Sequence, residues 1–402
     1  MFNLEEFINT YVIKRPCSMF QADIEKNTKE LEEKIQGKTI LVIGGAGSIG
    51  SSYIKAILPF KPKTLVVVDI NENALAELTR DLRSTKGLYV PEDFIPYPMD
   101  FASTTFEKMF RKRGGFDVVA NFSAHKHVRS EKDIFSIEAL LQNNVLHAKI
   151  LLDLLEEYPP EEYFCVSTDK AANPVNIMGA SKRVMEDVIF SYSDKFPVKT
   201  ARFANVAFSN GSLPTGFLAR ISKLQPLSAP SDVKRYFVSP EESGQICMLA
   251  CMLGKNREIF FPKLADAQMM TFDTIARELL NEQGFNVLEC QTDEEAIEKA
   301  ENLKQGSKQY PVHFSSSNTS GEKPFEEFYT DTEKVDMDRL NALGVIVDKE
   351  LTDRDRIETL FAELNHEFGK MEPTKSEVVQ IIKDYLPNFE HIETGKSLDS
   401  KM

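Results

Sequence analysis

The sequence of 402 residues has no tryptophan, only five cysteines and no apolar run near the roughly 20 residues that span a membrane. Its N-terminal stretch lacks the pattern of a secretory signal, so neither an anchor nor a leader is expected. The odd number of cysteines fits no disulfide framework. Cys247 and Cys251 lie four residues apart with no histidine nearby, which favours two buried side chains over zinc ligands. We therefore expect no metal site and a reducing, cytoplasmic location.

Positive charge is also scarce. The 48 lysines and arginines are outnumbered by 62 aspartates and glutamates, which gives a net charge of −14. Binding to nucleic acid or to an anionic membrane needs a basic face, so neither is expected as a partner. A small polyanion such as a nucleotide diphosphate remains compatible with this charge, because the backbone N–H groups of a helix N-terminus can hold it locally.

Apolar runs rich in β-branched residues alternate with amphipathic segments over the first half of the chain. Strands are expected at 39–43, 64–69, 94–98, 117–122, 163–167, 198–203 and 258–261. Helices are expected at 23–35, 72–83, 104–113, 137–157, 175–192, 241–253 and 293–303. This alternation predicts an α/β fold: a Rossmann-type doubly wound parallel sheet with a smaller C-terminal α+β substrate lobe.

The same pattern predicts four parts of the chain. They are an N-terminal helical extension at 1–37, a dinucleotide-binding domain at 38–210 with 236–262 returning to it, a nucleotide-sugar substrate lobe at 211–235 and 263–385, and a flexible tail at 386–402.

A glycine-rich turn follows the first expected strand. Gly44, Gly47 and Gly50 are spaced three residues apart, with Ser48 and Ile49 between the last two, and all five are expected to bind the cofactor. Glycine suits a tight turn where a pyrophosphate must approach the backbone, and the helix N-terminus then offers N–H groups to the phosphates. The turn therefore predicts a dinucleotide site.

Two acidic residues bear on which dinucleotide is bound. Asp69 ends the second expected strand, where a carboxylate accepts hydrogen bonds from the adenosine ribose and repels a 2′-phosphate. No arginine follows it, so NAD is favoured and NADP is the alternative. Asp100, after the third strand, is placed either to bind the adenine amino group or to cap a surface helix.

Several further segments carry a family resemblance. They are Asn-Phe-Ser-Ala-His-Lys-His-Val at 121–128, Ser-Thr-Asp-Lys at 167–170 with Met178 and Lys182 downstream, Arg-Phe-Ala-Asn-Val at 202–206, Arg-Tyr-Phe at 235–237, and Gly-Glu-Lys at 321–323 followed by Glu326 and Glu327. Together they resemble the extended short-chain dehydrogenase/reductase superfamily. More narrowly, they resemble its bacterial polysaccharide-biosynthesis group of UDP-N-acetylglucosamine 4,6-dehydratases. The resemblance covers roughly 14–265 and 319–330.

Met178 and Lys182 are four residues apart and share one face of a helix. Most members of the superfamily have a tyrosine at the position of Met178, and it takes the proton from the substrate hydroxyl. Methionine exchanges no proton, so another group must do so. This substitution resembles the configuration-retaining branch of the dehydratases. The resemblance implies that Lys182 holds the nicotinamide ribose.

Asp169 and Lys170 form an acid–base pair that an ordinary dehydrogenase does not need. The mechanistic hypothesis begins with transfer of hydride from sugar carbon 4 to the cofactor. Neutral Lys170 then removes the proton from carbon 5 while protonated Asp169 gives one to the leaving carbon 6 hydroxyl, and hydride returns to carbon 6. Thr168 either orients the carbon 4 hydroxyl or caps the loop.

The remaining candidates follow from the same motifs. Ser123 and Ala124 are assigned to the cofactor. The substrate candidates are Lys126, Asn144, Asn205, Arg235, Lys263 and Lys323, with Asn144 alternatively holding the active-site helix through a backbone contact. The interval from Lys263 to Gly321 is longer than the family pattern, and its 290–318 part has no assigned role.

Two other functions stay open. A related UDP-sugar epimerase, or a reductase that inverts carbon 5 of a 5,6-unsaturated sugar, is compatible with the missing tyrosine. A non-catalytic NAD(P)-sensing protein is the third reading, against which Asn144, Lys182 and the Asp169–Lys170 pair count. A homodimer or higher homo-oligomer is expected, with the helices at 137–157 and 175–192 as the interface. Burial inside one subunit would explain the apolar residues of the first helix equally well.

Overall fold

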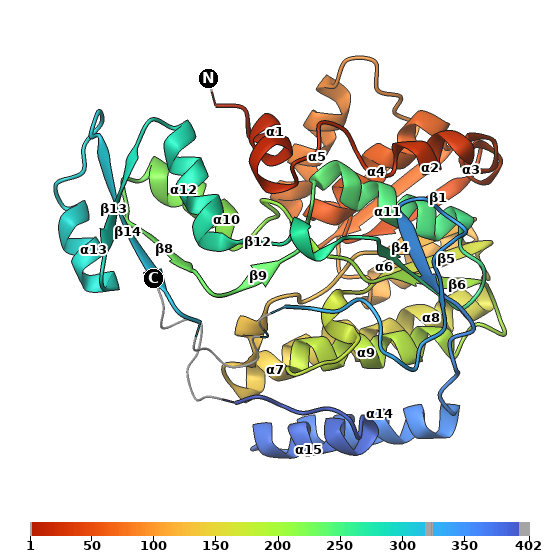
Figure 1. The fold of residues 1–402 in the computed structure, drawn as a ribbon. Coiled ribbons are helices and arrows are strands. Elements are labelled where there is room, and N and C mark those ends of the chain that lie inside the picture. The colour runs from red at the N-terminus through yellow and green to blue at the C-terminus, as the bar shows by residue number, and fades with distance from the viewer. Residues whose placement is uncertain (1, 318–322, 324, 394–402) are drawn as a thin grey trace.

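The computed structural model describes residues 2–317, 323 and 325–393, and gives only the backbone of Arg129 and Ser130. Its centre is a nine-stranded sheet in the order β15-β16-β11-β6-β5-β4-β1-β2-β3 (Figure 1). These strands are β1 (Thr39–Ile43), β2 (Thr64–Asp69), β3 (Asp93–Pro98), β4 (Val118–Asn121), β5 (Glu162–Val166), β6 (Val198–Ala201), β11 (Glu258–Pro262), β15 (Val335–Asp336) and β16 (Leu343–Ile346). All strands from β3 to β11 in this order are parallel. The expected Rossmann-type α/β fold is confirmed.

The central strands of this sheet are buried throughout because helices cover both of its faces. On one face, α4 (Ser48–Ile57) packs against α11 (Pro240–Leu253), and on the other lie α8 (His147–Glu157) and α9 (Ile177–Phe190) (Figure 1). Helix α5 (Glu72–Ser84) connects β2 to β3, and α6 (Thr104–Arg113) connects β3 to β4. A Cβ at Gly244 of α11 would lie 2.2 Å from the Ser52 carbonyl oxygen, so this glycine permits the close contact with α4.

The helix expected at 137–157 runs from Ile134 to Glu157, but it is not α-helical throughout. It consists of α7 (Ile134–Leu141), a π-helical turn over Gln142–Leu146, and α8. A π-turn inserts one residue into the helical repeat and commonly marks a functional position. Apolar periodicity alone does not reveal such an insertion.

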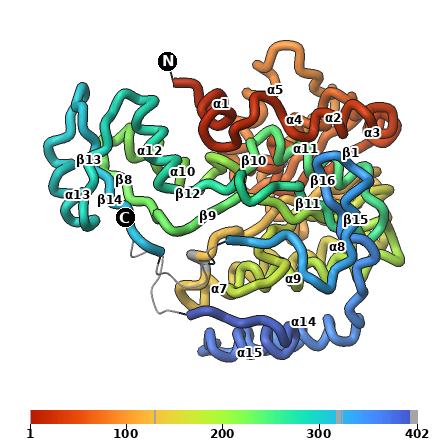
Figure 2. The backbone as a smooth tube through the Cα atoms, in the orientation of Figure 1, coloured from red at the N-terminus to blue at the C-terminus, as the bar shows by residue number. Residues whose placement is uncertain are grey.

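A second lobe lies to one side of the large sheet (Figures 1 and 2). Its parallel sheet has the order β13-β14-β8 and is packed by three helices. The elements are β8 (Leu227–Pro230), β13 (Asn286–Cys290), β14 (Gln309–Ser315), α10 (Leu213–Ser222), α12 (Phe272–Glu282) and α13 (Asp293–Ala300). Two short pairs join the lobe to the main sheet: β7 (Asn205–Val206) with β10 (Phe237–Val238), and β9 (Lys234–Arg235) with β12 (Met270–Thr271). The interval at 290–318 therefore supplies α13 and β14 of this lobe.

The N-terminal segment divides between the two cores. Helix α1 (Leu4–Phe7) and the π-turn Ile8–Val12 pack into the core of the second lobe. Helices α2 (Gln21–Lys26) and α3 (Thr28–Ile35) pack on the main core through Phe20, Leu31 and Ile35. Residues 1–37 were expected to be one helical extension, whereas they tie the lobes together.

The C-terminal assignments also need correction. Residues 263–385 were expected in the substrate lobe, but β16 pairs with β11 of the main sheet. Helices α14 (Arg354–Phe368) and α15 (Lys375–Tyr385) share the main core. The tail expected at 386–402 is ordered at its start: Phe389 is buried, and the Ile392 N–H donates to the Val175 carbonyl at 3.0 Å. Residues 394–402 lie outside the described part.

Helices α14 and α15 lie along the outer side of α8 and α9 (Figure 1). Arg354 binds Asp194 at 2.9 Å, and Lys149 faces Glu358 at 3.7 Å across this contact. The apolar residues that suggested a dimer interface are buried within the subunit: Leu140, Leu141, Val145, Leu151 and Leu152. The alternative explanation therefore accounts for them, and the oligomer remains a prediction. In the described part of the chain, no helix is long and apolar enough to cross a membrane.

Candidate active site at the carboxyl ends of the strands

The glycine turn after β1 fits closely between its neighbours. Gly44 has a φ of +70°, and a Cβ there would lie 2.6 Å from the Ser123 nitrogen. A Cβ on Gly50 would lie 2.4 Å from the Gly44 carbonyl oxygen. Gly45, which the sequence motif did not single out, is equally confined, 2.5 Å from Val67 Cγ1. Only glycine allows the turn, the strand end and helix α4 to approach this closely.

The start of α4 remains available to an anion. Gly47 at its N-cap provides no side-chain cap, and a Cβ there would meet only the Gly44 oxygen, at 3.3 Å. Ser48 accepts a hydrogen bond from the Asn210 N–H at 2.8 Å, whereas Ile49 packs partly into the core. An uncapped helix N-terminus beside a turn that excludes side chains fits a dinucleotide pyrophosphate.

Asp69 lies beside this turn. Its carboxylate accepts the Ala46 N–H at 3.0 Å and the Asn71 N–H at 2.9 Å. Each oxygen keeps a lone pair for a ribose hydroxyl. Asp100 is exposed and accepts the Ala102 N–H at 2.8 Å in the turn before α6. Ser103, not Asp100, is the N-cap of α6, so Asp100 does not cap that helix, and its contact with the adenine stays a prediction.

The π-turn places Asn144 under the 123–127 loop. Its amide nitrogen donates to the His125 carbonyl at 2.9 Å and to Ser181 Oγ at 3.0 Å, and its oxygen accepts the His125 N–H at 2.9 Å and the Asn143 amide at 3.1 Å. Both amide hydrogens and both lone pairs are thus used, and the side chain is 2% exposed. Asn144 braces the loop and α9, as the alternative assignment held, and is not free to bind a substrate.

Ser123 and Ala124 begin this braced loop and are partly buried. The Ser123 N–H donates to Asn121 Oδ1 at 2.9 Å, and its hydroxyl lies 3.2 Å from Asn143 Oδ1. Lys126 follows them with an exposed side chain, although desolvation lowers the pKa of its ammonium.

Helix α9 brings Met178 and Lys182 to the end of β5. Met178 is buried, and the Lys182 ammonium donates to the Val166 carbonyl at 3.1 Å. Burial lowers the pKa of Lys182, against the opposing effects of Cys165 and Glu186. The structure thus places Lys182 at the carboxyl edge of the sheet, where the expected ribose contact would lie.

Asp169 and Lys170 lie immediately beyond β5 in a short 3₁₀ turn, Asp169–Ala171. Asp169 Oδ1 accepts the Thr168 hydroxyl at 2.8 Å, the Lys170 N–H at 2.9 Å and the Lys170 ammonium at 3.0 Å. Burial by itself would lower the pKa of Lys170, but the charges of Asp169 and Glu326 outweigh it and raise that pKa. Beside these two carboxylates Lys170 is therefore an ammonium, not the neutral amine of the sequence hypothesis.

Glu326 and Arg235 complete this charged cluster. Glu326 Oε1 lies 3.6 Å from the Lys170 ammonium and 4.0 Å from Arg235 Nη2. Arg235 also donates to the backbone carbonyls of Lys234 and Lys323, both at 2.9 Å. The side chains of these four charged residues are between 4% and 17% exposed: Asp169, Lys170, Arg235 and Glu326. Glu326 belonged to a matching motif but was not assigned a role, because its approach to Lys170 spans 156 residues of sequence.

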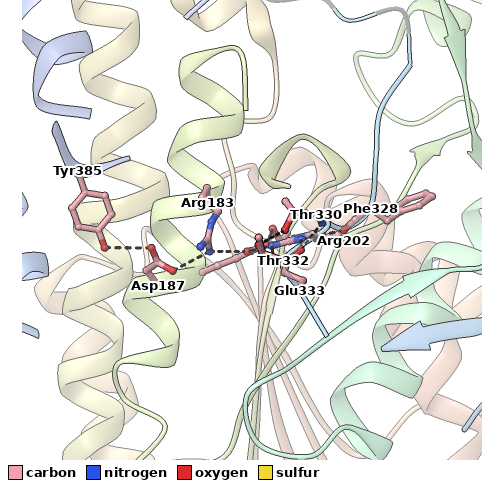
Figure 3. Close-up of polar contacts among 10 residues, drawn as sticks. Arg183, Asp187, Arg202, Phe328, Thr330, Thr332, Glu333 and Tyr385 are labelled. Carbon is pink, nitrogen blue, oxygen red and sulfur yellow. Dashed lines mark hydrogen bonds and ion pairs between the residues drawn. The ribbon is translucent and has the colours of Figure 1, made fainter. Parts of the chain in front are cut away.

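A second buried network holds this region together (Figure 3). Arg202, at the end of β6, binds Glu186 of α9 through two hydrogen bonds of 2.8 and 2.7 Å and Glu333 through two of 2.8 and 2.9 Å. It also donates to the Phe328 carbonyl at 3.1 Å. Glu186 accepts the Ser167 hydroxyl at 2.6 Å, next to Thr168. The guanidinium therefore fixes the 328–333 segment relative to β5 and α9.

Glu186→Gln is expected to lower the free energy of unfolding at neutral pH by about 3 kcal/mol. Although burial opposes it, Arg202 lowers the pKa of Glu186 from 4.5 to about 2. The stabilisation from the ionised carboxyl is thus present above pH 4.5 and is lost as the pH falls toward 2. Urea unfolding across this range should show a flatter acid dependence for Glu186→Gln, whereas Glu77→Gln, on the surface, should behave like the parent protein. An unchanged acid dependence would contradict this role.

The remaining substrate candidates are Asn205, Lys323 and Lys263, and not all of them keep the role expected from the sequence. Asn205 starts β7 and is partly buried. The Lys323 ammonium donates to the Asn173 carbonyl. The Lys263 ammonium donates to the Met337 and Leu340 carbonyls, the latter at 2.7 Å, so it supports this turn and is not available as the substrate ligand expected from the sequence. Gly321 and the residues beside it, 318–322 and 324, lie outside the described residues.

Comparison with known proteins adds family relationships. The model of the family described as polysaccharide biosynthesis protein matches residues 40–345. An uncharacterized membrane protein of Methanocaldococcus jannaschii is 33% identical over 265 residues, covering 64% of this chain and 76% of the relative. The probable polysaccharide biosynthesis protein EpsC of Bacillus subtilis is 28% identical over 346 residues, covering 84% of this chain but only 55% of the relative. An inverting UDP-N-acetylglucosamine 4,6-dehydratase of Campylobacter jejuni is 25% identical over 302 residues, covering 73% and 82%.

Solved structures share the fold at low sequence identity. The Pen protein from Bacillus thuringiensis superposes with a TM-score of 0.63 at 18% identity, covering 82% of this chain and 98% of that one. The dTDP-glucose 4,6-dehydratase DesIV from Streptomyces venezuelae, solved with NAD bound, gives a TM-score of 0.55 at 18% identity, covering 72% and 88%.

Proposed function

This chain belongs to the polysaccharide biosynthesis protein family, and on that premise we propose that it is an NAD(P)-dependent nucleotide-sugar 4,6-dehydratase. It is an extended short-chain dehydrogenase/reductase, and enzymes of this type include dehydratases and epimerases. The proposed substrate is UDP-N-acetylglucosamine or a close UDP-N-acetylhexosamine, converted for surface polysaccharide or other glycan synthesis. The observation that carries the proposal is the buried Asp169–Lys170 pair, 3.0 Å apart, beyond the end of β5.

Dehydration needs two proton transfers on adjacent carbons, and the pair supplies both. NAD, when bound, would supply reversible hydride transfer: it would accept a hydride from carbon 4, which leaves a ketone there, and return that hydride to carbon 6. The ketone makes the carbon 5 proton acidic, and Lys170 as a neutral amine removes it. Asp169 as a neutral acid protonates the carbon 6 oxygen, the carbon–oxygen bond breaks, and water leaves with formation of a carbon 5–carbon 6 double bond. Lys170 then returns a proton to carbon 5. The proton released from the carbon 4 hydroxyl on oxidation passes by way of the Thr168 hydroxyl, 2.8 Å from Asp169 Oδ1, to the pair and replaces the proton that left in water.

This scheme requires the pair to change its protonation first. Beside Asp169 and Glu326, Lys170 has the proton, since these two charges raise its pKa despite its burial. Moving that proton over the 3.0 Å to Asp169 Oδ1 gives the neutral acid and neutral base together. A low-dielectric pocket favours this neutral form over the ion pair once water is excluded.

The dinucleotide would be held by the turn Gly44–Gly50, by Asp69 at the adenosine ribose and by Lys182 at the nicotinamide ribose. Asp69 also favours NAD over NADP, because its carboxylate would repel a 2′-phosphate. Calorimetric titration is expected to give NAD at least about a tenfold lower dissociation constant than NADP, and Asp69→Asn should narrow that ratio. Equal affinities in the parent protein would contradict the assignment.

The proposal is tested by mixing the protein with NAD and UDP-N-acetylglucosamine in deuterated water and following the sugar by proton NMR. A carbon 6 methyl signal with deuterium at carbon 5 is the expected result, and the ring couplings report whether carbon 5 is retained. If no methyl signal appears while the protein binds NAD, the dehydratase proposal fails for this sugar. A changed ring configuration without a methyl signal would instead identify an epimerase.

A further inference from the structure

Glu326 reaches the active site on a segment that is attached on both sides. On one side lies Asn173, in the loop after Lys170. The Lys323 ammonium donates to the Asn173 carbonyl, and the Asn173 side-chain amide donates to the Glu327 carboxylate at 2.8 Å. On the other side, the Phe328 carbonyl accepts from the Arg202 guanidinium at 3.1 Å. The Lys323 carbonyl also accepts from Arg235 at 2.9 Å, so backbone hydrogen bonds at Lys323 and Phe328 flank Glu326 and hold its carboxyl 3.6 Å from Lys170.

The charge balance of the cluster depends on this carboxyl. Two acids, Asp169 and Glu326, face Lys170, and Arg235 from β9 and Lys323 from the same segment also act on Glu326. With both acids ionised, two negative charges hold the proton on Lys170. With Glu326 protonated, only Asp169 opposes the buried positive charges of Lys170 and Arg235, and the ammonium becomes costlier.

We propose that Glu326 is a positioning residue that controls where the proton of the Asp169–Lys170 pair lies. While the Glu326 carboxyl is ionised, Lys170 stays an ammonium and Asp169 a carboxylate. When the Glu326 carboxyl takes a proton from solvent, the Lys170 proton moves to Asp169, and the pair becomes the neutral amine and neutral acid that dehydration needs. The inference deepens the proposed function, and its first step can be measured without any substrate.

The tendency of Glu326 to hold a proton has a physical source. Its carboxyl is 5% exposed, and this burial raises its pKa above the ordinary value, as does the charge of Asp169. The positive charges of Lys170, Arg235 and Lys323 oppose the shift without cancelling it. Raising the pKa means that the carboxyl keeps its proton to a higher pH than an exposed glutamate does.

The direct test titrates Lys170 in protein labelled with carbon-13 at the lysine Cε, with the resonance assigned by its loss in Lys170→Arg. In Glu326→Gln, which imitates the protonated carboxyl, the Lys170 resonance is expected to titrate at lower pH than in the parent protein. Glu327→Gln is the matched control, since that exposed neighbour bonds Asn173 and not Lys170. Equal Lys170 titration in the parent protein and in a folded Glu326→Gln variant would overturn the proposal, whatever the enzyme's substrate.

The kinetic test follows methyl formation against pH. In the parent protein the rate is expected to fall as the pH rises through the Glu326 titration, because Lys170 is then locked as an ammonium. In Glu326→Gln this decline should be absent, because the amide cannot ionise, while Glu326→Asp should keep a decline. A folded Glu326→Gln protein as inactive as Lys170→Ala would overturn the proposal, because it would mean that an ionised Glu326 is required. Absence of methyl formation in the parent protein would count against the proposed dehydratase function and leave the lysine titration to decide on Glu326.

Discussion

Lys170→Ala is expected to reduce formation of the carbon 6 methyl group by a factor of about 10² to 10⁴, the usual contribution of a positioned acid–base group. The variant should keep the fold, because the Lys170 backbone N–H still donates to Asp169 and Glu326 keeps its contact with Arg235. Removing the amine leaves no group at that position to take the carbon 5 proton. Single-turnover mixing with the UDP-sugar measures both the methyl signal and deuterium entry at carbon 5.

Two further variants show whether the pair acts as a unit. Asp169→Asn should be impaired comparably, and the double variant should be hardly worse than either single one, since both residues serve the same step. Lys304→Ala, an exposed lysine of the second lobe, is the control for loss of one positive charge. Methyl formation at the parent rate in Lys170→Ala would remove the pair from the mechanism.

Gly44→Ala is expected to abolish dinucleotide binding and to lower the free energy of unfolding by roughly 2 to 5 kcal/mol. About 1 to 2 kcal/mol comes from a side chain at a φ of +70°, and about 1 to 3 kcal/mol from overpacking. The overpacking is unavoidable, because the new Cβ would lie 2.6 Å from the Ser123 nitrogen and 2.7 Å from the Phe122 carbonyl carbon, both backbone atoms. Fluorescence titration with NADH and urea unfolding measure the two effects.

Gly87→Ala provides the matched control. Gly87 has a φ of +80°, close to that of Gly44, but no atom of the described residues lies within 4 Å of a Cβ added there. It should therefore show only the conformational cost of about 1 to 2 kcal/mol and bind the dinucleotide normally. If Gly44→Ala behaves like Gly87→Ala, the turn does not need its close packing and the assigned dinucleotide site is wrong.

Local patterns located the main sheet because its strands are short, apolar and bounded by turns. The strands expected at 39–43 and 64–69 are β1 and β2 to the residue, and the helix expected at 104–113 is α6. Sequence patterns did not predict the features that depend on tertiary contacts. The π-helical turn at Gln142–Leu146 has no distinct pattern of apolar residues. The β13-β14-β8 sheet brings together strands from 227 to 315 that are separated by helices. The polar residues of 354–385 likewise concealed the apolar faces of α14 and α15.

The candidate site shows the same division. The glycine turn, Asp69 and the Asp169–Lys170 pair could be predicted as site residues because each is recognisable within a few neighbouring residues, and the family resemblance implied that Met178 replaces a tyrosine. No local pattern could predict that Glu326 stands beside Lys170, that Arg202 joins Glu186 to Glu333, or that Asn144 and Lys263 donate to backbone carbonyls. The reason is that the protonation of a buried group depends on every charge within a few ångströms, and those charges come from distant parts of the chain.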